Sequence, residues 1–335
     1  MKPLWLILAA VELLAQPAPL VWLNHNQPVL DAHNCYPYDG RWADRIDRAL
    51  ASGFPVSIEQ DLTWDERSRR VVVTHRAEAD GSEPALRDYF FERVRPIVEK
   101  ALAENDTRRW PLIVLHFDFK SESLPLLQAV WSLLGEYQSW ITTAPKLADP
   151  ATLAPFDTKP ILVITEDSDA QEQVFYKQLP AGARLRVFGS AHTARSPGES
   201  REERAHFLAT LPPEKLLIDR PTNYRRWWNN SWYEVEEGGQ TRAGDWTPAD
   251  AERLRALVDR AHRLGYWIRF YTLDGFPQGD DHGWSEDYNF GSLEAARIRW
   301  RAAIAAGVDF IATDQYEDLG RQIKASSESS AAAAR

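Results

Sequence analysis

The feature that most constrains the fold is an alternation between short apolar runs rich in β-branched residues and longer segments with helical periodicity. This alternation is typical of β-α-β units, in which helices cover a parallel sheet. The predicted strands are Val29–Asn34, Val56–Thr63, Leu112–Phe119, Ile161–Thr165, Leu185–Ser190, Leu216–Asp219, Trp267–Thr272 and Phe310–Thr313. The predicted helices include Trp42–Ala51, Pro84–Ala103, Leu124–Tyr137, Glu202–Leu211, Pro248–Leu264 and Leu293–Ala306.

Eight such units predict the α/β class and a single (β/α)8 TIM barrel, a fold that about 250 residues or more can form as one domain. An open, doubly wound sheet is the alternative. Two connections are unusually long and rich in aromatic residues: Arg220–Trp246 after the sixth predicted strand and Asp274–Gly291 after the seventh. We expect both to fold over one end of the barrel.

The two ends of the chain differ in composition from the rest. Lys2 and an apolar stretch from Leu4 to Leu14, interrupted by Glu12, have the layout of a secretory signal, so we expect residues 1–18 to be a signal peptide. The barrel domain would then span residues 19–324, and the Ser/Ala-rich residues 325–335 would be a disordered tail. We therefore expect a secreted or periplasmic protein, with a cytoplasmic location as the alternative.

Charge and cysteine content exclude several classes of partner. The 39 basic and 49 acidic residues leave a net charge of −10, which disfavours binding to nucleic acid or an anionic membrane. Cys35 is the single cysteine, so the chain has neither an intramolecular disulfide nor a Cys-rich zinc site. No later apolar run has membrane-spanning length. We expect a monomer without a transmembrane segment in its mature form, acting on a small-molecule or lipid substrate.

Polar residues gather where the first two predicted strands end, the place where such barrels build their active sites. His33 and Asn34 end the first strand, and Glu59 and Asp61 lie two residues apart in the second, so they point the same way. Two carboxylates that share one face repel each other, and a bound cation would relieve that repulsion. Hard oxygen ligands suit Ca2+ or Mg2+.

A second histidine and a third carboxylate follow. His75 comes after a polar turn, close in sequence to the carboxylate pair. The third strand places His116, Asp118 and Lys120 on one side, so Asp118 is a candidate ligand and Lys120 a candidate phosphate contact. A solvated strand edge and a surface ion pair are the ordinary alternatives for such residues taken one at a time.

The joint order of these residues resembles the phospholipase-C-like phosphodiesterase superfamily. His33, Glu59, Asp61 and His75 match the first half of its pattern, and Gly307–Asp314 looks like its last strand. His-Asn followed by Tyr resembles the calcium-dependent phosphoinositide phospholipases, where the Asn is a metal ligand. Asp-Phe-Lys looks more like the glycerophosphodiester phosphodiesterases and sphingomyelinase-D-like enzymes, although the His-Arg-Gly opening of the glycerophosphodiesterases is missing. The pattern is thus mixed, and the substrate stays open.

The resemblance implies a metal-dependent phosphoric diester hydrolase acting on a phospholipid or glycerophosphodiester. His33 and His75 would exchange the protons, and attack by a hydroxyl of the substrate would give a cyclic phosphate. One divalent cation, with Ca2+ favoured over Mg2+, would be held by four ligands: Asn34, Glu59, Asp61 and Asp118.

Four further side chains are predicted to bind the substrate. Lys120 and Arg269 would neutralise the phosphate, and Trp228 and Trp284 of the long loops would contact its organic part.

Two other functions are compatible with a barrel of this kind. One is a glycoside hydrolase that uses Glu59, Asp61 and Glu166 with the tryptophan-rich loops, which would leave the histidines and Lys120 without a role. The other is a catalytically inactive barrel that binds a ligand through its aromatic loops.

Overall fold

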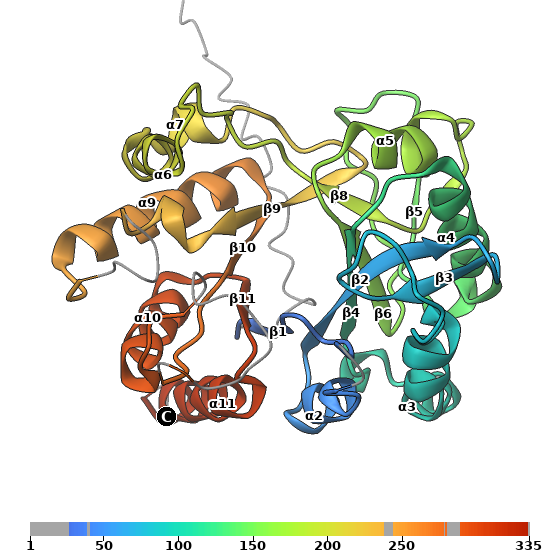
Figure 1. The fold of residues 1–335 in the computed structure, drawn as a ribbon, viewed down its shortest axis with the longest axis horizontal. Helices are drawn as coiled ribbons and strands as arrows, with labels where there is room; N and C mark the ends of the chain where they lie inside the picture. The colour runs from blue at the N-terminus through green and yellow to red at the C-terminus, as the bar shows by residue number, and fades with distance from the viewer. Residues whose placement is uncertain (1–26, 39–40, 238–243, 278, 280–288, 334–335) are drawn as a thin grey trace, which may run out of the picture.

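The barrel is built from eight parallel strands in chain order (Figure 1). The computed structural model describes residues 27–38, 41–237, 244–277, 279 and 289–333. The eight strands are β1 (Val29–Ala32), β2 (Val56–Asp65), β4 (Ile113–Phe119), β6 (Ile161–Thr165), β8 (Phe188–Ser190), β9 (Arg225–Ser231), β10 (Trp267–Tyr271) and β11 (Phe310–Thr313).

The register of the first and last strands closes the sheet. β1 pairs in parallel with β2, with Leu30 opposite Val56, and also with β11, with Val29 opposite Phe310. Every other neighbouring pair in the ring is parallel as well. The predicted (β/α)8 barrel is therefore confirmed.

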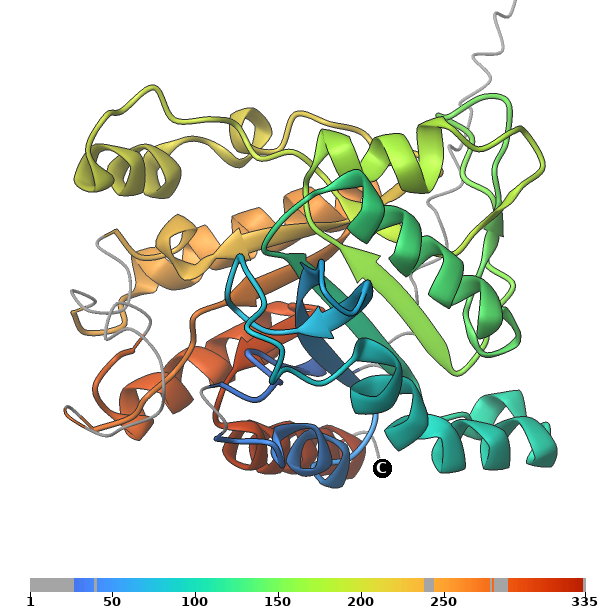
Figure 2. The ribbon, with the colours of Figure 1, turned by 45° about the vertical axis from the view of Figure 1, so that its right-hand side comes forward.

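Helices form the outer layer around the strands, as the two ribbon views show (Figures 1 and 2). The α-helices are α2 (Arg45–Ala51), α3 (Glu92–Glu104), α4 (Leu124–Glu136), α5 (Asp169–Glu172), α6 (Arg201–Thr210), α7 (Pro213–Leu216), α9 (Pro248–Leu264), α10 (Leu293–Ala306) and α11 (Tyr316–Ala333). Shorter 3-10 and π-helical turns are η1 (Arg87–Phe91), η2 (Thr107–Arg109), η3 (Gln138–Trp140), η4 (Gln173–Lys177) and η5 (Trp232–Glu234). Within the described residues, no helix is both long enough and apolar enough to cross a membrane.

Among the described residues, three short strands lie outside the ring. β3 (Arg70–Val73) runs antiparallel to the carboxyl half of β2, with Leu62 opposite Val73, and so extends that strand as a hairpin. β5 (Ala144–Pro145) and β7 (Arg184–Leu185) form a separate antiparallel pair. The hairpin matters for the site because it brings the chain from Asp61 to His75 back to the same end of the barrel.

Alternation along the strands separates apolar from polar side chains. In β4, Ile113, Leu115 and Phe117 are fully buried and belong to the hydrophobic core under the helices. His116 and Asp118 point the other way, towards the interior of the ring. A strand buried on both faces can carry polar side chains inside the barrel only if they have partners there, so these residues mark the site.

Helix ends follow the local sequence signals. Thr247 accepts a hydrogen bond from the backbone of Asp250 and Pro248 occupies the first turn of α9, while Gly265 ends the helix at φ = 91°. Ser292 caps α10 in the same way, accepting from the backbone N–H of Ala295. The predicted bounds of these two helices are confirmed.

The sixth strand was predicted in the wrong place. Leu216 ends the short helix α7, and the strand is β9, inside the segment expected to be a loop. β9 has the sequence Arg-Arg-Trp-Trp-Asn-Asn-Ser. Trp is common in strands, but Asn is not, and the segment has no β-branched residue, so its strand signal is weak. It is held by tertiary contacts, among them Arg225 Nη2 to Glu172 Oε2 at 2.6 Å. Leu216 and Leu217 are fully buried outside the ring, which accounts for the apolar run predicted to be a strand.

Two smaller predictions also need correction. Of the predicted fifth strand, only Phe188–Ser190 joins the barrel, as β8, whereas Leu185 pairs within β7. The segment from Ala325, expected to be disordered, continues α11 as far as Ala333. Its alanines have the highest helix propensity, and the helix begins on the buried residues Tyr316 and Leu319. The predicted signal peptide lies outside the described residues.

Candidate active site inside the barrel

The interior of the barrel holds a layer of charged side chains. Arg269 of β10, which is 2% exposed, donates hydrogen bonds to the carboxylates of Asp31 and Glu59 and, at 2.9 Å, to Oδ1 of Asn229. His116 lies beside the same carboxylates, with Nδ1 3.5 Å from Glu59 Oε2. A guanidinium held by three partners from three strands cannot readily turn to a substrate, so the predicted phosphate contact of Arg269 does not fit its position.

Two residues further along each strand, a second layer brings Asp61 opposite Asp118 in the parallel register of β2 and β4. Asp61 is fully buried, whereas the Asp118 side chain is 36% exposed. Nζ of Lys120 lies 2.8 Å from Oδ2 of each carboxylate. Lys120 is thus the cation that partners this pair in the structure.

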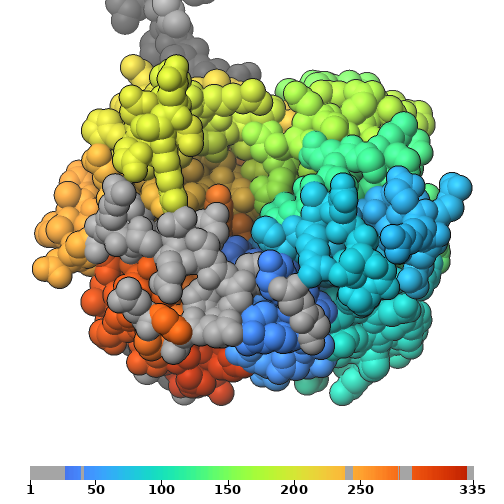
Figure 3. All heavy atoms as spheres, in the orientation of Figure 1, coloured from blue at the N-terminus to red at the C-terminus, as the bar shows by residue number. Residues whose placement is uncertain are grey.

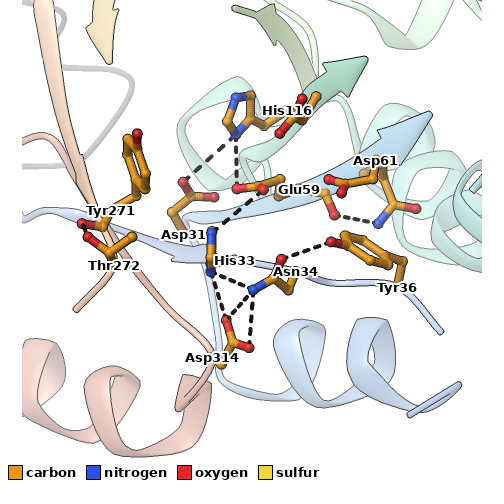
Figure 4. A network of polar contacts seen from close by, with 12 residues as sticks. Asp31, His33, Asn34, Tyr36, Glu59, Asp61, His116, Tyr271, Thr272 and Asp314 are labelled. Atoms are coloured by element: carbon orange, nitrogen blue, oxygen red, sulfur yellow. Dashed lines mark hydrogen bonds and ion pairs between the residues drawn. The ribbon is translucent and has the colours of Figure 1, made fainter. Parts of the chain in front are cut away.

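His33, directly after the first strand, is fixed by the carboxylate of Asp314, directly after the last strand (Figure 4). His33 Nδ1 lies 2.8 Å from Asp314 Oδ1, and Nε2 lies 3.9 Å from Glu59 Oε1. Nδ2 of Asn34 donates to Asp314 at 3.1 Å, and Oδ1 of Asn34 accepts from the Tyr36 hydroxyl at 2.8 Å. The Asn34 amide is therefore engaged with Asp314 and Tyr36 in this arrangement and not with the three carboxylates predicted to share its cation.

The electrostatics of the site separate its carboxyl groups. Burial alone would raise the pKa of Glu59, but the positive charges of His33 and Arg269 hold this pKa well below its ordinary value. Burial, together with the nearby Asp118 carboxylate, raises the pKa of Asp61 well above its ordinary value, even though Lys120 opposes the shift. The pKa values of Glu59 and Asp61 thus shift in opposite directions. Glu59 has several positive charges around it, whereas Asp61 shares the single charge of Lys120 with Asp118.

The histidines are shifted in opposite directions. Burial lowers the pKa of His33, but Glu59 and Asp314 outweigh it and the net effect raises the pKa to about 9. His75 is exposed, with its ring centre 6.4 Å from that of Tyr38, and burial of part of the ring followed by the charge of Lys120 lowers its pKa. Since Asp118 and His33 also act on this pKa, His75 lies within electrostatic reach of the carboxylate site.

Three groups of acidic and histidine side chains within the described ranges have the spacing of metal ligands. The group of Asp31, Glu59 and His116 already contains the guanidinium of Arg269, and in the group of His33, Asp274 and Asp314 the histidine is hydrogen-bonded to a carboxylate. The third group is Glu59, Asp61 and Asp118, whose ligand oxygens all lie within 4.8 Å of one another. Oxygens at that spacing can share one ion at the Ca2+–oxygen distance of about 2.3 to 2.6 Å.

A second observation also favours a cation at the group of Glu59, Asp61 and Asp118. Oδ1 of Asp61 is buried and receives no hydrogen bond from the described residues. A buried carboxylate oxygen without a donor is costly unless a cation neutralises it. The three carboxylates meet as the sequence predicts, and their chemistry suits a divalent cation.

The predicted aromatic contacts are placed differently. Trp228 belongs to β9, is fully buried and donates from Nε1 to Thr193 Oγ1 at 2.8 Å, so it offers no surface to a substrate. Trp227 and Trp232 are fully buried as well, and Trp284 lies outside the described residues. The expectation that these tryptophans were exposed rested on reading β9 as a loop. Tyr271 is half-buried, with its ring centre 6.3 Å from that of His33, and is an aromatic side chain at the site.

Sequence reasoning gave no role to several residues of this network. Asp314 is predicted only as the end of the last strand and Asp31 has no predicted role, yet Asp314 fixes the His33 ring and Asp31 holds Arg269. Asp274 accepts from the Thr313 hydroxyl at 2.6 Å, and burial beside Asp314 raises its pKa to about 7. The available signal was their position at or just after strand ends, which in this fold marks the catalytic face.

Seen from the direction of Figure 1, the molecular surface is hollowed near its centre, and blue atoms from the early part of the chain lie at the edge of the hollow (Figure 3). The fold and its polar interior therefore define a (β/α)8 barrel with a cluster of carboxylates, histidines and a lysine at strand ends.

Comparison with known proteins assigns no function to the chain. No protein-family profile and no curated protein matches the chain. Among solved structures, it is similar to a glycerophosphoryl diester phosphodiesterase from Parabacteroides distasonis, with 14% identity, a TM-score of 0.42 and coverage of 89% of this chain and 87% of that one. A second glycerophosphodiester phosphodiesterase from the same organism shows 12% identity and a TM-score of 0.44, covering 90% of this chain and 98% of that one.

A dihydropteroate synthase from Burkholderia cenocepacia is similar to the same degree, with 12% identity, a TM-score of 0.42 and coverage of 92% of this chain and 93% of that one. All three are enzymes, but their named activities differ. Likeness at this level does not favour one reaction over another, so the function has to be argued from the site.

Proposed function

We propose that the chain is a metal-dependent phosphoric diester hydrolase. The observation that carries the proposal is the convergence of Glu59, Asp61 and Asp118, with ligand oxygens within 4.8 Å of one another, beside a histidine fixed by a carboxylate. A hydrolytic site for a diester needs a cationic centre for the phosphate and a group that moves protons. The three carboxylates would hold the cation, and His33 would move the proton.

Different residues of the site would bind the cation and transfer the protons. Glu59, Asp61 and Asp118 would hold the divalent cation, which would neutralise a phosphate oxygen and the charge that develops during attack. Asp314, bonded to Nδ1, orients the His33 ring so that Nε2 is directed towards Glu59 and is free to move a proton. His75 is the second proton-transfer group, placed within electrostatic reach of Lys120 and Asp118.

The organic part of the substrate would be bound by side chains beside the phosphate site. With Trp228 buried, Tyr271 becomes the aromatic contact that the geometry supports. A glycerophosphodiester or a phospholipid fits a site with one cation, and the net charge of −10 disfavours a substrate with many phosphates. We favour Ca2+ over Mg2+ because three carboxylates with unequal burial suit the less demanding geometry of Ca2+. Export and a monomeric state remain part of the proposal.

The glycoside hydrolase alternative loses its main support. It relied on exposed tryptophans for sugar binding, but Trp227, Trp228 and Trp232 are fully buried. Glu166, one of its candidate carboxylates, accepts from Asn229 at 2.9 Å and lies 2.7 Å from His116 Nε2.

The test is a panel of glycerophosphocholine, lysophospholipid, sphingomyelin and phosphatidylinositol, assayed after removal of metal with a chelator and again with Ca2+ or Mg2+. We expect turnover of at least one member that needs the added metal and falls by about 10²- to 10⁴-fold in His33→Ala and His75→Ala. His206→Ala is the matched control, because that histidine is 63% exposed and pairs with Glu237. Folded protein that turns over no member with either metal would remove the proposal and leave a binding barrel.

A further inference from the structure

Lys120 lies where a cation is needed. Its Nζ is 2.8 Å from Oδ2 of Asp61 and 2.8 Å from Oδ2 of Asp118. The third carboxylate of the group, Glu59, has a different partner in the buried guanidinium of Arg269. Without a metal, therefore, the charge of the Asp61 and Asp118 pair is balanced by this one ammonium within the described part of the site.

The same two carboxylates are the proposed metal ligands. The Lys120 ammonium lies 2.8 Å from Oδ2 of each carboxylate, and a divalent cation would lie about 2.3 to 2.6 Å from an oxygen of the same carboxylates. Even if the cation binds the other oxygen of each group, the two like charges would be within a few ångströms of each other. Little water separates charges around a fully buried Asp61, so their repulsion is only weakly screened. Both cations cannot keep these positions at low free energy.

Arg269 and Lys120 differ in how easily they can move away from the carboxylates. Arg269 is 2% exposed and bonded to Asp31, Glu59 and Asn229, so it is fixed. The Lys120 side chain is 19% exposed and carries its charge on a flexible four-carbon stem. Its ammonium can move towards solvent, and towards a bound phosphodiester, without breaking the barrel interior.

We propose that Lys120 is the internal counter-ion of Asp61 and Asp118 and that the divalent cation displaces its ammonium, which then becomes available to the phosphate. The inference rests on the proposed function for the identity of the metal ligands. It goes further by making one lysine stabilise the metal-free site and serve the substrate only once the cation has entered.

The direct test needs no mutation. Wild-type protein is treated with an amine-acetylating reagent, first with chelator and then with saturating Ca2+ or Mg2+, and the modification of each lysine is measured by mass spectrometry. Displacement predicts a severalfold increase at Lys120 when metal binds and no change at Lys100, whose side chain is 75% exposed. Modification of Lys120 that stays the same or falls upon saturation would overturn the proposal.

A variant supplies the thermodynamic counterpart. Lys120→Met removes the competing charge, so the Kd for Ca2+ measured by calorimetry should tighten by about tenfold, equivalent to about 1.4 kcal/mol. The metal-free variant should melt at a lower temperature than wild type, and metal should restore the difference, while Lys100→Met should change neither. An unchanged or weaker Kd in a folded Lys120→Met protein contradicts displacement.

The outcomes separate the two proposals. If neither wild type nor Lys120→Met binds Ca2+ or Mg2+, the metal site itself is refuted, and with it the proposed function. If wild type binds metal and hydrolyses a diester while the modification of Lys120 does not change, only the displacement is refuted.

Discussion

Replacing Asp61 with Asn should stabilise the metal-free protein while abolishing its response to metal. Asp61 is fully buried, and its pKa lies well above the ordinary value because of burial and the Asp118 carboxylate, even with Lys120 beside it. The ionised carboxylate therefore opposes folding when no metal is bound, and an amide of nearly the same shape removes that cost.

The expected magnitude follows from the size of such relief at functional sites. A single stabilising substitution commonly contributes about 0.5 to 2 kcal/mol, and we take this range for the removal of the buried charge. At about 2 to 4 °C per kcal/mol for a large domain, the Tm of metal-free Asp61→Asn should rise by about 1 to 8 °C at pH 7. Wild type should gain about 2.7 kcal/mol from Ca2+ at 100 times its Kd, and the variant almost none.

The sign of the pH dependence gives a further check. A group whose pKa is raised in the folded state contributes stability that is fully present below its unfolded pKa, about 3.9 for Asp, and that is lost as pH rises through the folded value. The advantage of Asp61→Asn should thus disappear near pH 4 and grow towards pH 7.

The assay is thermal unfolding at several pH values, with chelator and with Ca2+. Asp169→Asn is the matched control, since that side chain is 83% exposed. A metal-free Asp61→Asn protein that melts below wild type at pH 7, or one that keeps the full shift with Ca2+, would refute the reasoning.

Three other predictions concern the surroundings of the site. Asp314→Asn should lower kcat by about 10²-fold or more with little change in KM, because the amide cannot orient the His33 ring as the carboxylate does; steady-state kinetics measure this, and an unchanged kcat would contradict it. In metal-free wild type, His33 with a pKa of about 9 contributes stability that is fully present below pH 6.5 and lost as pH rises through 9; urea unfolding should show this loss, and Asp314→Asn should show less of it. Trp228→Phe should leave KM unchanged and cost about 1 kcal/mol of stability through the lost bond to Thr193, whereas a large increase in KM would restore Trp228 as a substrate contact.

Local patterns were sufficient for much of the barrel. The bounds of β6, α9, α10 and β11 agree with the predicted ones, because each element combines a clear period with capping residues or a run of β-branched and apolar residues. β9 was missed for the opposite reason. Its two Trp residues favour a strand, but its Asn residues do not and it has no β-branched residue. It lies in the sheet because its side chains bond to residues from other parts of the fold, such as Glu172 and Thr193.

Much of the proposed metal-ligand group follows from the alternation of side chains along a strand. Glu59 and Asp61 share a direction in any strand, and the alternation of elements implies that the neighbouring strand is parallel. Asp118 joins them because the register of β2 and β4 places it opposite Asp61, and that register is seen only in the structure. Sequence therefore contained the composition of the carboxylate group. It also contained the histidine that ends the first strand, since strand ends are where this fold exposes polar side chains.

Only the tertiary structure shows which charged side chains contact each other. Arg269 looks like a free cation in the chain, but the closed ring places it between Asp31 and Glu59, two residues that are 238 and 210 positions away. Asp314 reaches His33 across 281 positions because β11 closes on β1. Electrostatic energy depends on distance and burial, and neither is encoded in the spacing of residues along one strand, so the roles of these side chains became visible only when the barrel was closed.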